Sequence, residues 1–320
     1  MKRVLNLVAL AAIVIFCSLA AQPVMAGEQK AVLITGASTG IGRNMAERLA
    51  GEGFFVYAGA RKDKDLVELD AIENIKAVRL DVTSQEDIGA AVALITAEGR
   101  GLWGLVNNAG VATRAPVAEI SDSDMDFVFD VNVMGVVRVT RAFLPLIVEN
   151  KGRVVTTGSV AGIGSSPGGS VYSMTKHAVE AFTDSLAGEM AAAGVQVSVI
   201  EPGSYKSRIR RNAIGRFMEG IEAADGEVPE EMRAQAKQLA EQEVAMDEPD
   251  DVSTALVHAL SADTAQRRYL VTPNRGQAER TIRALIREVA ELNQWEQRHL
   301  TRDELVQMLD EALDPQPASD

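Results

Sequence analysis

The sequence predicts an α/β fold in which a doubly wound parallel sheet of about seven strands is covered by helices on both faces. Three observations support this: hydrophobic strand segments alternate with helical segments, a glycine-rich turn follows the first strand segment, and no internal repeat or low-complexity linker divides the chain. Strands that are hydrophobic throughout are typical of parallel sheets buried on both faces. The 320 residues, 47% of them hydrophobic, suit one compact α/β domain or two small ones.

The amino-terminal segment, residues 1–26, differs from the rest of the chain. Two basic residues precede an uncharged run, residues 4–26, which ends in a site with a small residue at its last position. This layout predicts a signal peptide, although the run is also long enough to remain as a membrane anchor. In either case we expect the rest of the chain on the side of the membrane opposite the cytoplasm, either exported or anchored. The alternative is that translation starts at Met25, which would leave a cytoplasmic protein.

Composition argues against several classes of function. A net charge of −13 is unsuited to a nucleic-acid surface. The single cysteine, Cys17, lies in the amino-terminal segment, so one chain can form neither a disulfide nor a thiolate metal site. The three histidines, His177, His258 and His299, are far apart and lack metal-ligand spacing. We therefore expect no nucleic-acid partner and no metal.

The first strand segment, residues 30–35, leads into a glycine-rich turn, Thr35-Gly36-Ala37-Ser38-Thr39-Gly40-Ile41-Gly42, and then a helical pattern over residues 41–51. Glycines let a pyrophosphate approach the backbone, and the start of the helix supplies free N–H groups. The spacing G-x-x-x-G-x-G differs from the common dinucleotide fingerprint G-x-G-x-x-G. A phosphate cradle is therefore predicted, and a plain strand–helix turn is the alternative.

The second strand segment, residues 54–59, ends at two cations, Arg61 and Lys62. In dinucleotide-binding folds this strand end reads the adenosine ribose, where a carboxylate would bind the 2′-hydroxyl. A guanidinium group instead suits a 2′-phosphate. The sequence thus favours NADP over NAD, although a solvated turn would look the same and the neighbouring Asp63 weakens the argument.

The third strand segment, residues 75–80, ends in Asp81 and Val82, at the sheet edge where ligands bind. Thr83 and Glu86 then fit a capping box for the following helix.

The fourth strand segment, residues 102–106, closes with Asn107-Asn108-Ala109-Gly110, which would line a ligand or form a simple turn. A long helical region then starts at Ser121, with Asp124 as a weaker capping acid, and runs to about Glu149. It contains Asn132 among apolar residues. This amide is expected either to bond its own helix backbone or to hold a water near an active centre.

The fifth strand segment, residues 152–157, is followed by Ser159 and then by a helix over residues 171–193 that carries Tyr172 and Lys176. The tyrosine and the lysine are four residues apart and share one helix face. A neighbouring ammonium lowers the pKa of a phenol, which makes it a usable general acid or base. A packed ring beside a solvated amine is the alternative for this pair alone.

The rest of the chain is expected to finish the sheet and add helices. A sixth strand over residues 195–200 ends before Pro202 and Gly203, a helix covers 247–260, and a seventh strand covers 268–272. The charged helical residues 204–247 would form a lid over the ligand crevice or a solvated helix pair. The domain boundaries follow as residues 1–26, 27–275 and 276–320, the last a helical extension that would close the substrate pocket or form a subunit interface.

Together these pieces closely resemble the short-chain dehydrogenase/reductase family from residue 30 to about residue 207. The resemblance is carried, in order, by Thr35-Gly36-x-x-x-Gly40-x-Gly42, Asp81-Val82, Asn107-Asn108-Ala109-Gly110, Asn132, Ser159, Tyr172-x-x-x-Lys176 and Pro202-Gly203. It implies a Rossmann-type fold and reversible hydride transfer between NAD(P) and a carbonyl/alcohol pair. The amino-terminal segment and the long carboxyl-terminal extension depart from the family pattern.

The resemblance also implies a role for each matching residue. Tyr172 would be the catalytic acid/base, Lys176 would lower its pKa and hold the nicotinamide ribose, Ser159 would bind the substrate oxygen, and Asn132 would anchor a water in a proton relay with Lys176. The cofactor would contact Gly36, Ser38, Gly40, Ile41 and Gly42 at the pyrophosphate, Asp81 and Val82 at the adenine, and Asn108, Ala109, Gly110, Tyr172, Lys176, Pro202, Gly203 and Ser207 elsewhere, with Arg61 at a 2′-phosphate.

Three functional hypotheses follow. The leading one is an NADP-preferring oxidoreductase that acts on a small, hydrophobic carbonyl or alcohol and associates as a homodimer or homotetramer. The second is a catalytically silent NAD(P)-binding regulatory protein of the same fold, and the third is an isomerase or lyase that uses the same site. Membrane attachment through residues 4–26 accompanies the anchored alternative.

Overall fold

A computed structural model describes residues 29–223 and 226–314 of the chain. The predicted signal peptide or membrane anchor at residues 1–26 lies outside the described residues.

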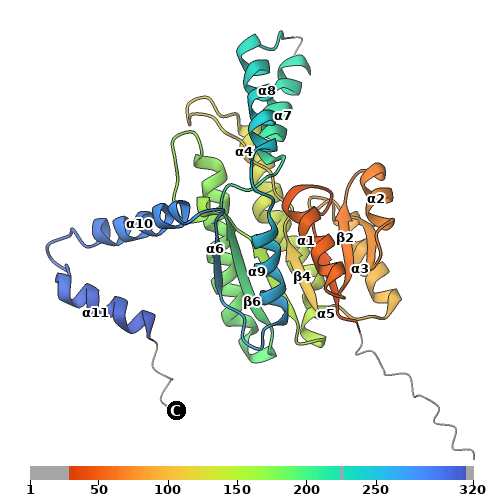
Figure 1. Ribbon diagram of the computed structural model, residues 1–320, viewed down its shortest axis with the longest axis horizontal. Coiled ribbons are helices and arrows are strands. Elements are labelled where there is room, and N and C mark those ends of the chain that lie inside the picture. Colours follow the sequence, from red (N-terminus) through yellow and green to blue (C-terminus); the bar gives the residue numbers. More distant parts are fainter. Residues whose placement is uncertain (1–28, 224–225, 315–320) are drawn as a thin grey trace, which may run out of the picture.

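Seven parallel strands form one sheet in the order β3-β2-β1-β4-β5-β6-β7 (Figure 1). The strands are β1 (Ala31–Ile34), β2 (Phe55–Ala60), β3 (Ile75–Arg79), β4 (Gly104–Asn107), β5 (Arg153–Thr157), β6 (Gln196–Pro202) and β7 (Arg268–Val271). The chain winds outward from β1 to β3, returns to β4 beside β1, and continues outward to β7. Such a reversal leaves a ligand crevice at the carboxyl ends of the two central strands. The predicted fold class is confirmed.

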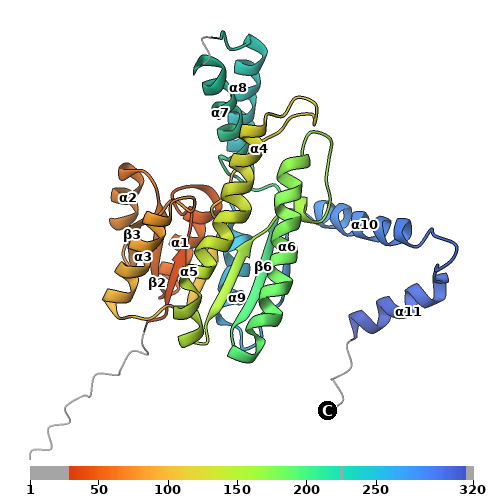
Figure 2. The same cartoon turned by 180° about the vertical axis from the view of Figure 1, so that it is seen from behind.

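Helices cover both faces of the sheet, and Figures 1 and 2 show the two sides. The α-helices are α1 (Gly40–Gly51), α2 (Asp63–Asp70), α3 (Gln85–Glu98), α4 (Asp122–Phe129), α5 (Val136–Glu149), α6 (Ser170–Met190), α7 (Ile209–Ala223), α8 (Glu230–Val244), α9 (Asp250–Ser261), α10 (Arg275–Leu292) and α11 (Arg302–Leu313). A π-helical segment, Asp130–Gly135, joins α4 to α5. The 3₁₀ turns Val160–Gly162 and Ala191–Ala193 flank α6.

Two hydrophobic cores lie on opposite faces of the sheet, and β1 contributes to both. Val32 and Ile34 pack with α1, α2 and α9 on one face, whereas Ala31 and Leu33 pack with α3, α5 and α6 on the other. This alternation follows from the two-residue period of a strand. Because both faces are covered, β1 is hydrophobic at every position, which is the pattern that predicted a buried parallel sheet.

The N-caps of helices α4 and α3 can be compared with the caps predicted at Ser121 and Thr83. The Ser121 side chain accepts a hydrogen bond of 3.1 Å from the backbone N–H of Asp124, as predicted for the start of α4. The capping box at Thr83 is wrong. Ser84 caps α3 and accepts from the N–H of Asp87 at 3.1 Å, because the Thr83 hydroxyl donates to Asp81 instead. Helix α2 was not predicted either.

The helix Asp122–Glu149 is the one described helix that is long and apolar enough, by length and composition alone, to cross a membrane. Phe143 and Ile147 of its α5 part are fully buried in the core against the sheet. The packing in the structure therefore accounts for its apolar character.

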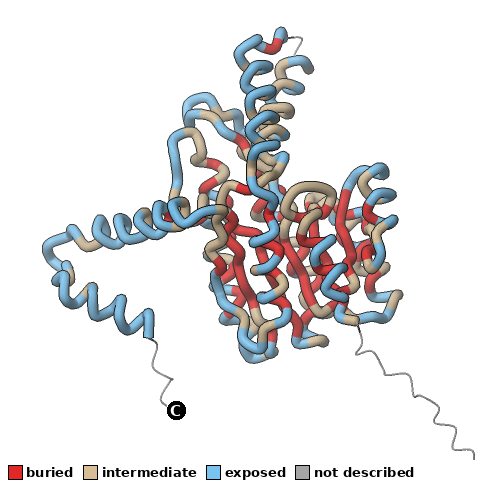
Figure 3. The backbone as a smooth tube through the Cα atoms, in the orientation of Figure 1, coloured by how far each residue is buried: buried red, intermediate tan, exposed pale blue. Residues whose placement is uncertain are grey.

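Two helical features extend beyond the layered body (Figure 1). The α7–α8 pair stands above the carboxyl edge of the sheet, and α10 and α11 form an arm that leaves the body near α6 (Figures 1 and 2). Figure 3 shows that buried residues concentrate in the sheet and its covering helices, while the arm is almost wholly exposed. Residues 276–313 thus form two helices, in agreement with the amphipathic pattern.

Candidate functional site

A cleft of about 270 Å³ opens at the carboxyl ends of the central strands, between the glycine-rich turn and the start of α7. The structure places each residue predicted to contact the cofactor in the wall of this cleft: Gly36, Ser38, Gly40, Ile41, Gly42, Arg61, Asp81, Val82, Asn108, Ala109, Gly110, Tyr172, Lys176, Pro202, Gly203 and Ser207. Ser159 lines it too, whereas Asn132 lies just behind the wall.

The glycine-rich turn is shaped so that side chains would not fit. Gly36 has φ +65°, and a Cβ there would lie 2.8 Å from the Cα of Ala109. A Cβ on Gly42 would lie 2.4 Å from the carbonyl oxygen of Gly36. Thr39, the N-cap of α1, makes no side-chain capping bond, and the first turn has no acidic residue. The amino-terminal N–H groups of α1 are therefore available to an anion.

Thr35 and Asn108 hold the β1 and β4 ends together. The Thr35 hydroxyl accepts hydrogen bonds from the backbone N–H groups of Asn108 and Ala109, both at 3.0 Å. The Asn108 amide nitrogen donates to the carbonyl oxygens of Thr35 at 3.0 Å and of Gly36 at 3.1 Å. These bonds fix the turn across the switch point. Thr35 was part of the predicted motif, but this bracing role was not foreseen.

Asp81 and Arg61 meet at the outer end of the cleft. The Asp81 carboxylate accepts from the N–H of Thr83 at 2.9 Å and from its hydroxyl at 2.7 Å, while Arg61 Nη1 lies 3.4 Å from its other oxygen. Burial opposes ionisation of Asp81, but the Thr83 hydrogen bonds and the Arg61 charge outweigh it and lower the pKa of the carboxyl. The carboxylate is thus ionised and already has its partners.

Lys176 is fixed inside the cleft wall. The lysine is 5% exposed, and its Nζ donates to the carbonyl oxygen of Thr157, the last residue of β5, at 2.8 Å. Its Nζ lies 5.7 Å from the centre of the Tyr172 ring. Ser159, two residues beyond Thr157, lines the same cleft as Tyr172, and its hydroxyl lowers the pKa of that phenol. Strand β5 and helix α6 therefore bring the predicted serine, tyrosine and lysine together.

Burial sets the direction of the Tyr172 pKa in this structure, while the effect of Lys176 on the phenol stays a prediction. Burial raises the pKa of Tyr172, and the hydroxyl of Ser159 and the charge of Arg210 only partly oppose it. Burial also lowers the pKa of Lys176 to about 8, against the charge of Glu180. The ammonium donates to the Thr157 carbonyl, and its Nζ lies 5.7 Å from the centre of the Tyr172 ring.

Asn132 lies in the π-helical segment and bonds to a neighbouring loop, not to its own helix. Its Oδ1 accepts from the backbone N–H of Val111, and its Nδ2 donates to the Val111 carbonyl, both at 2.8 Å. Nδ2 also lies 3.1 Å from the Thr175 hydroxyl of α6. Single π turns are frequent at functional sites because they redirect side chains from a regular helix. Asn132 therefore joins the β4 loop, the long helix and α6.

Two buried carboxyl groups lie behind the lysine. Glu180, one turn after Lys176, and Glu201, at the end of β6, both approach Nε of Arg268, at 3.0 Å and 3.8 Å. Glu201 is 1% exposed, and burial together with Glu180 raises its pKa to about 8. Asp184 stays ionised, since the Arg268 guanidinium lowers its pKa. Glu180 and Glu201 are thus expected to share one proton at neutral pH.

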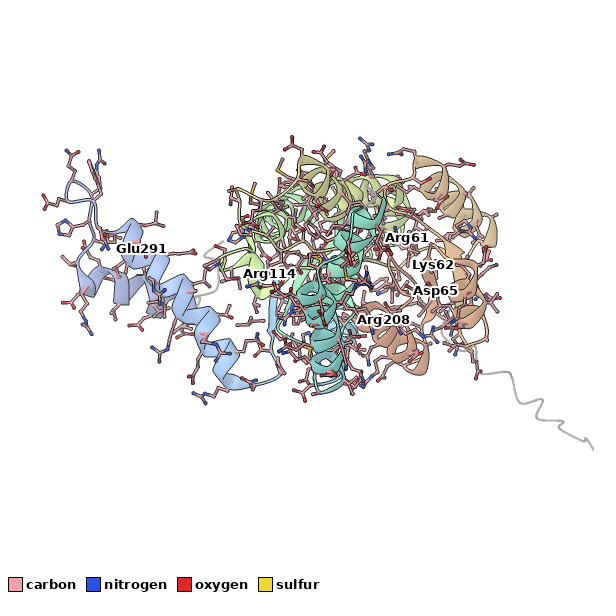
Figure 4. All side chains as sticks on the ribbon, turned by 90° about the horizontal axis from the view of Figure 1, so that it is seen from above. Arg61, Lys62, Asp65, Arg114, Arg208 and Glu291 are labelled. Atoms are coloured by element: carbon pink, nitrogen blue, oxygen red, sulfur yellow. The ribbon has the colours of Figure 1, made fainter. Side chains whose placement is uncertain are left out.

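The sequence analysis missed part of the cleft wall. Four residues around the start of α7 also line it: Tyr205, Arg208, Ile209 and Asn212. In Figure 4, Arg208 lies by helix α7, on the side of the molecule where Arg61 and Lys62 also lie. The signal was the density of cations directly after Pro202-Gly203, which the sequence analysis assigned only to a lid or a solvated helix.

Comparison with known proteins identifies the family. The family model described as short chain dehydrogenase matches residues 30–215. Mitochondrial D-beta-hydroxybutyrate dehydrogenase of Bos taurus is 39% identical over 264 residues, which cover 75% of this chain and 76% of that protein. Retinol dehydrogenase 16 of Homo sapiens is 36% identical over 253 residues, covering 75% of this chain and 80% of that protein.

A solved structure agrees. The short-chain dehydrogenase from Streptomyces avermitilis superposes with a TM-score of 0.65 at 27% identity, covering 90% of this chain and 99% of that one. Fold, cleft and relatives lead to the same conclusion: the chain belongs to the short-chain dehydrogenase/reductase family and is an oxidoreductase.

Proposed function

We propose that the protein interconverts a carbonyl and an alcohol with NAD(P), and that Tyr172 is its acid/base. The observation that carries the proposal is the meeting of Ser159, Tyr172 and Lys176 in the same cleft as the glycine-rich turn. A bound nicotinamide would supply or accept the hydride there. The tyrosine would supply or remove the proton at the substrate oxygen.

The cleft fits a dinucleotide on structural grounds. Gly36 and Gly42 line the cleft and pack so closely against Ala109 and Asn108 that no side chain fits there, and the uncapped start of α1 lines the same cleft. Such a cradle suits a pyrophosphate. Gly36, Ser38, Gly40, Ile41 and Gly42 would hold this group, with Asp81, Val82, Asn108, Ala109 and Gly110 at the adenosine half and Pro202, Gly203 and Ser207 at the nicotinamide half.

Each polar residue near Tyr172 has a distinct proposed task. Ser159 would orient the substrate oxygen toward the phenol. Lys176, held by the Thr157 carbonyl, would keep a positive charge beside the ribose hydroxyls and stabilise the phenolate when it forms. Asn132 would hold the loop at Val111 and support a water-mediated path for protons from Lys176.

We further propose a preference for NADP. Arg61 lines the cleft at the end of β2 and is 57% exposed at its side chain, so it could turn toward a 2′-phosphate. Its contact with Asp81 is long for an ion pair, at 3.4 Å, so little interaction energy would be lost if Arg61 turned away from Asp81. Asp63, the acid near the end of β2, is paired with Arg79, and the Asp81 carboxylate at the end of β3 is oriented by Thr83.

The substrate is proposed to be a small hydrophobic molecule, since Val111 and Ile209 line the same cleft as the tyrosine. The names of the two relatives give a hydroxy acid and an alcohol as their substrates. These substrates agree with the proposed class of reaction but do not single out one substrate for this chain. Export or membrane anchoring through residues 1–26 and assembly as a homodimer or homotetramer are retained as proposals, with a cytoplasmic protein starting at Met25 as the alternative.

The test is the consumption of NADPH and NADH by the full chain with a carbonyl panel that includes retinal and acetoacetate as probes. Oxidation of the reduced cofactor with at least one carbonyl supports the proposal. Tight cofactor binding with no turnover across the panel would favour the catalytically silent regulatory protein instead. Product analysis separates a reductase from an isomerase or lyase.

A further inference from the structure

Arg216 of helix α7 joins the α7–α8 pair to the body of the molecule. Its Nη2 donates to the carbonyl oxygen of Ala112 at 3.3 Å and to the Asp124 carboxylate at 3.2 Å. Its guanidinium also lies over the ring of Phe127, 4.3 Å from the ring centre. Figures 1 and 2 both show α4, which carries Asp124 and Phe127, beside the pair. We call these contacts of Arg216 with Ala112, Asp124 and Phe127 the Arg216 clamp.

The Arg216 clamp differs from an exposed ion pair, which contributes little to stability. The side chains of Arg216 and Asp124 are 29% and 19% exposed, whereas Arg233 and Glu222, which pair α8 with α7, are both 57% exposed. Asp124 is itself held in place, because its other carboxylate oxygen accepts from the Ser121 hydroxyl at 2.8 Å. The aromatic face adds a cation–π attraction. The guanidinium is therefore fixed from three directions.

The Arg216 clamp connects two segments that line the cleft. On α7, Arg216 comes four residues after Asn212, and Asn212 lines the cleft. Residues at this spacing share one helix face. On the other side, Ala112 directly follows Val111, which lines the cleft from the loop after β4. One side chain thus ties the start of α7 to the loop after β4.

The same loop is held from the body by Asn132. Asn132 exchanges two hydrogen bonds of 2.8 Å with the backbone of Val111, and its amide also donates to the Thr175 hydroxyl of α6 at 3.1 Å. Arg216 and Asn132 therefore hold adjacent residues of one loop, Ala112 and Val111. A connected set of hydrogen bonds runs from α7 through this loop to the helix that carries the proposed acid/base.

We infer that Arg216 is a positioning residue that holds the start of α7 and the loop after β4 at the separation in which the cleft binds its carbonyl substrate. The inference rests on the proposed function. Arg216 acts through Ala112 and Asn212 rather than on the substrate. A displaced wall weakens the binding and orientation of a reactant. Loss of the clamp should therefore impair use of the carbonyl and leave the cofactor cradle at Gly36 and Gly42 intact.

The first test measures amide hydrogen exchange of the full chain, which needs no turnover. Arg216→Gln removes the charge and keeps a polar side chain. Exchange of the segment 109–116 is expected to become at least about tenfold faster, because a hydrogen bond to a charged group is lost there. The matched control, Arg211→Gln, removes an arginine of the same helix that pairs with Glu243 of α8, and it should leave the segment unchanged. Unchanged exchange in Arg216→Gln overturns the inference.

The second test measures kinetics with a carbonyl that the wild type reduces. Arg216→Gln should raise the KM for the carbonyl at least about tenfold, with a smaller change in kcat and an unchanged affinity for NADPH. Arg216→Lys, which keeps a charge beside Asp124, should recover part of this loss. Asp124→Asn should also raise KM. The double variant Arg216→Gln/Asp124→Asn should lose less than the two single variants together, because both remove the same interaction.

The outcomes separate the inference from the proposed function. A KM in Arg216→Gln equal to that of Arg211→Gln, or additive losses in the double variant, overturns the inference. A wild-type chain that reduces no carbonyl contradicts the proposed function, and hydrogen exchange then decides whether the clamp holds the loop. Melting curves establish that each variant is folded at the temperature of the assay, and Arg216→Lys replaces Arg216→Gln if the latter is not.

Discussion

The ammonium group of Lys176 donates a 2.8 Å hydrogen bond to the carbonyl oxygen of Thr157, and this bond ties helix α6 to the end of strand β5. It holds a buried charge, which would otherwise be costly, against a fixed dipole. The bond also fixes the positions of Tyr172 and Ser159 relative to each other, because Tyr172 lies on helix α6 and Ser159 comes two residues after the end of strand β5. The proposed acid/base site is thus a junction between two elements.

Asn132→Ala should damage both stability and turnover. Its side chain satisfies the backbone N–H and carbonyl of Val111, and an unpaired buried polar group costs about 1–3 kcal/mol. We expect a lower melting temperature and a loss of turnover greater than that of Asn150→Ala, where the amide merely bonds the carbonyl of Leu146 at the end of α5. Equal effects of the two substitutions would argue that Asn132 has no special link to the site.

Gly42→Ala should abolish or strongly weaken cofactor binding. The new Cβ would lie 2.3 Å from the Asn108 amide nitrogen and 2.4 Å from the Gly36 carbonyl oxygen, so the turn must move. Gly89→Ala in α3 is the control, because nothing lies within 4 Å of that Cβ and alanine favours a helix by about 0.5–1 kcal/mol. Fluorescence titration with NADPH measures both; similar affinities would refute the cradle.

Arg61→Ala should reduce the preference for NADPH over NADH by about tenfold or more, the value of a hydrogen bond to a charged group. The physical reason is the loss of the guanidinium that lines the cleft directly after β2. Lys64→Ala removes a similar charge from an exposed position paired with Glu68 and should leave the preference unchanged. Ratios of kcat/KM for the two cofactors give the measurement, and an unaltered ratio in Arg61→Ala would sink the NADP proposal.

The stability of the protein should fall as pH rises from about 5 to about 8, through the pKa of Glu201, which is raised to about 8. In that window the unfolded state has lost the proton that the folded state retains, so the slope reaches about 1.4 kcal/mol per pH unit. Glu180, whose pKa is also raised by burial, shares this proton, while Arg268 and Asp184 keep their charges.

Glu201→Gln is the direct check on this pH dependence. The amide replaces the protonated carboxyl, so the difference in unfolding free energy between the variant and the wild type should grow with pH over the same window. Urea unfolding at several pH values provides the curves. Parallel curves for the two proteins would mean that both carboxyls are ionised and paired with Arg268.

The elements were predictable where local pattern and packing agree. β1 is buried at all four positions and was found from its hydrophobic run, and the glycine-rich turn was found because Gly36 and Gly42 have no room for side chains. The predicted Thr83 cap was wrong because Thr83 and Ser84 can both cap a helix, and the hydrogen bond that Thr83 donates to Asp81 leaves Ser84 as the cap. This hydrogen bond depends on the conformation of the folded loop.

The relations between distant elements were not predictable. The partner of Asn132 is 21 residues away, and the π segment that aims it has the same apolar pattern as a regular helix. The direction of the Tyr172 pKa depends on burial, which sequence spacing does not reveal. Likewise, Glu180 and Glu201 meet only because α6 packs on β6, so their shared proton has no sequence signal.

Tyr172→Phe tests the central proposal most directly, with Tyr205→Phe as its control at a second tyrosine of the cleft wall. On a carbonyl that the wild type reduces, the account predicts that Tyr172→Phe loses at least about a hundredfold in kcat. It should bind NADPH nearly as tightly as the wild type, while Tyr205→Phe keeps most of its turnover. Wild-type turnover in Tyr172→Phe would contradict the account, because the proton would then come from another group.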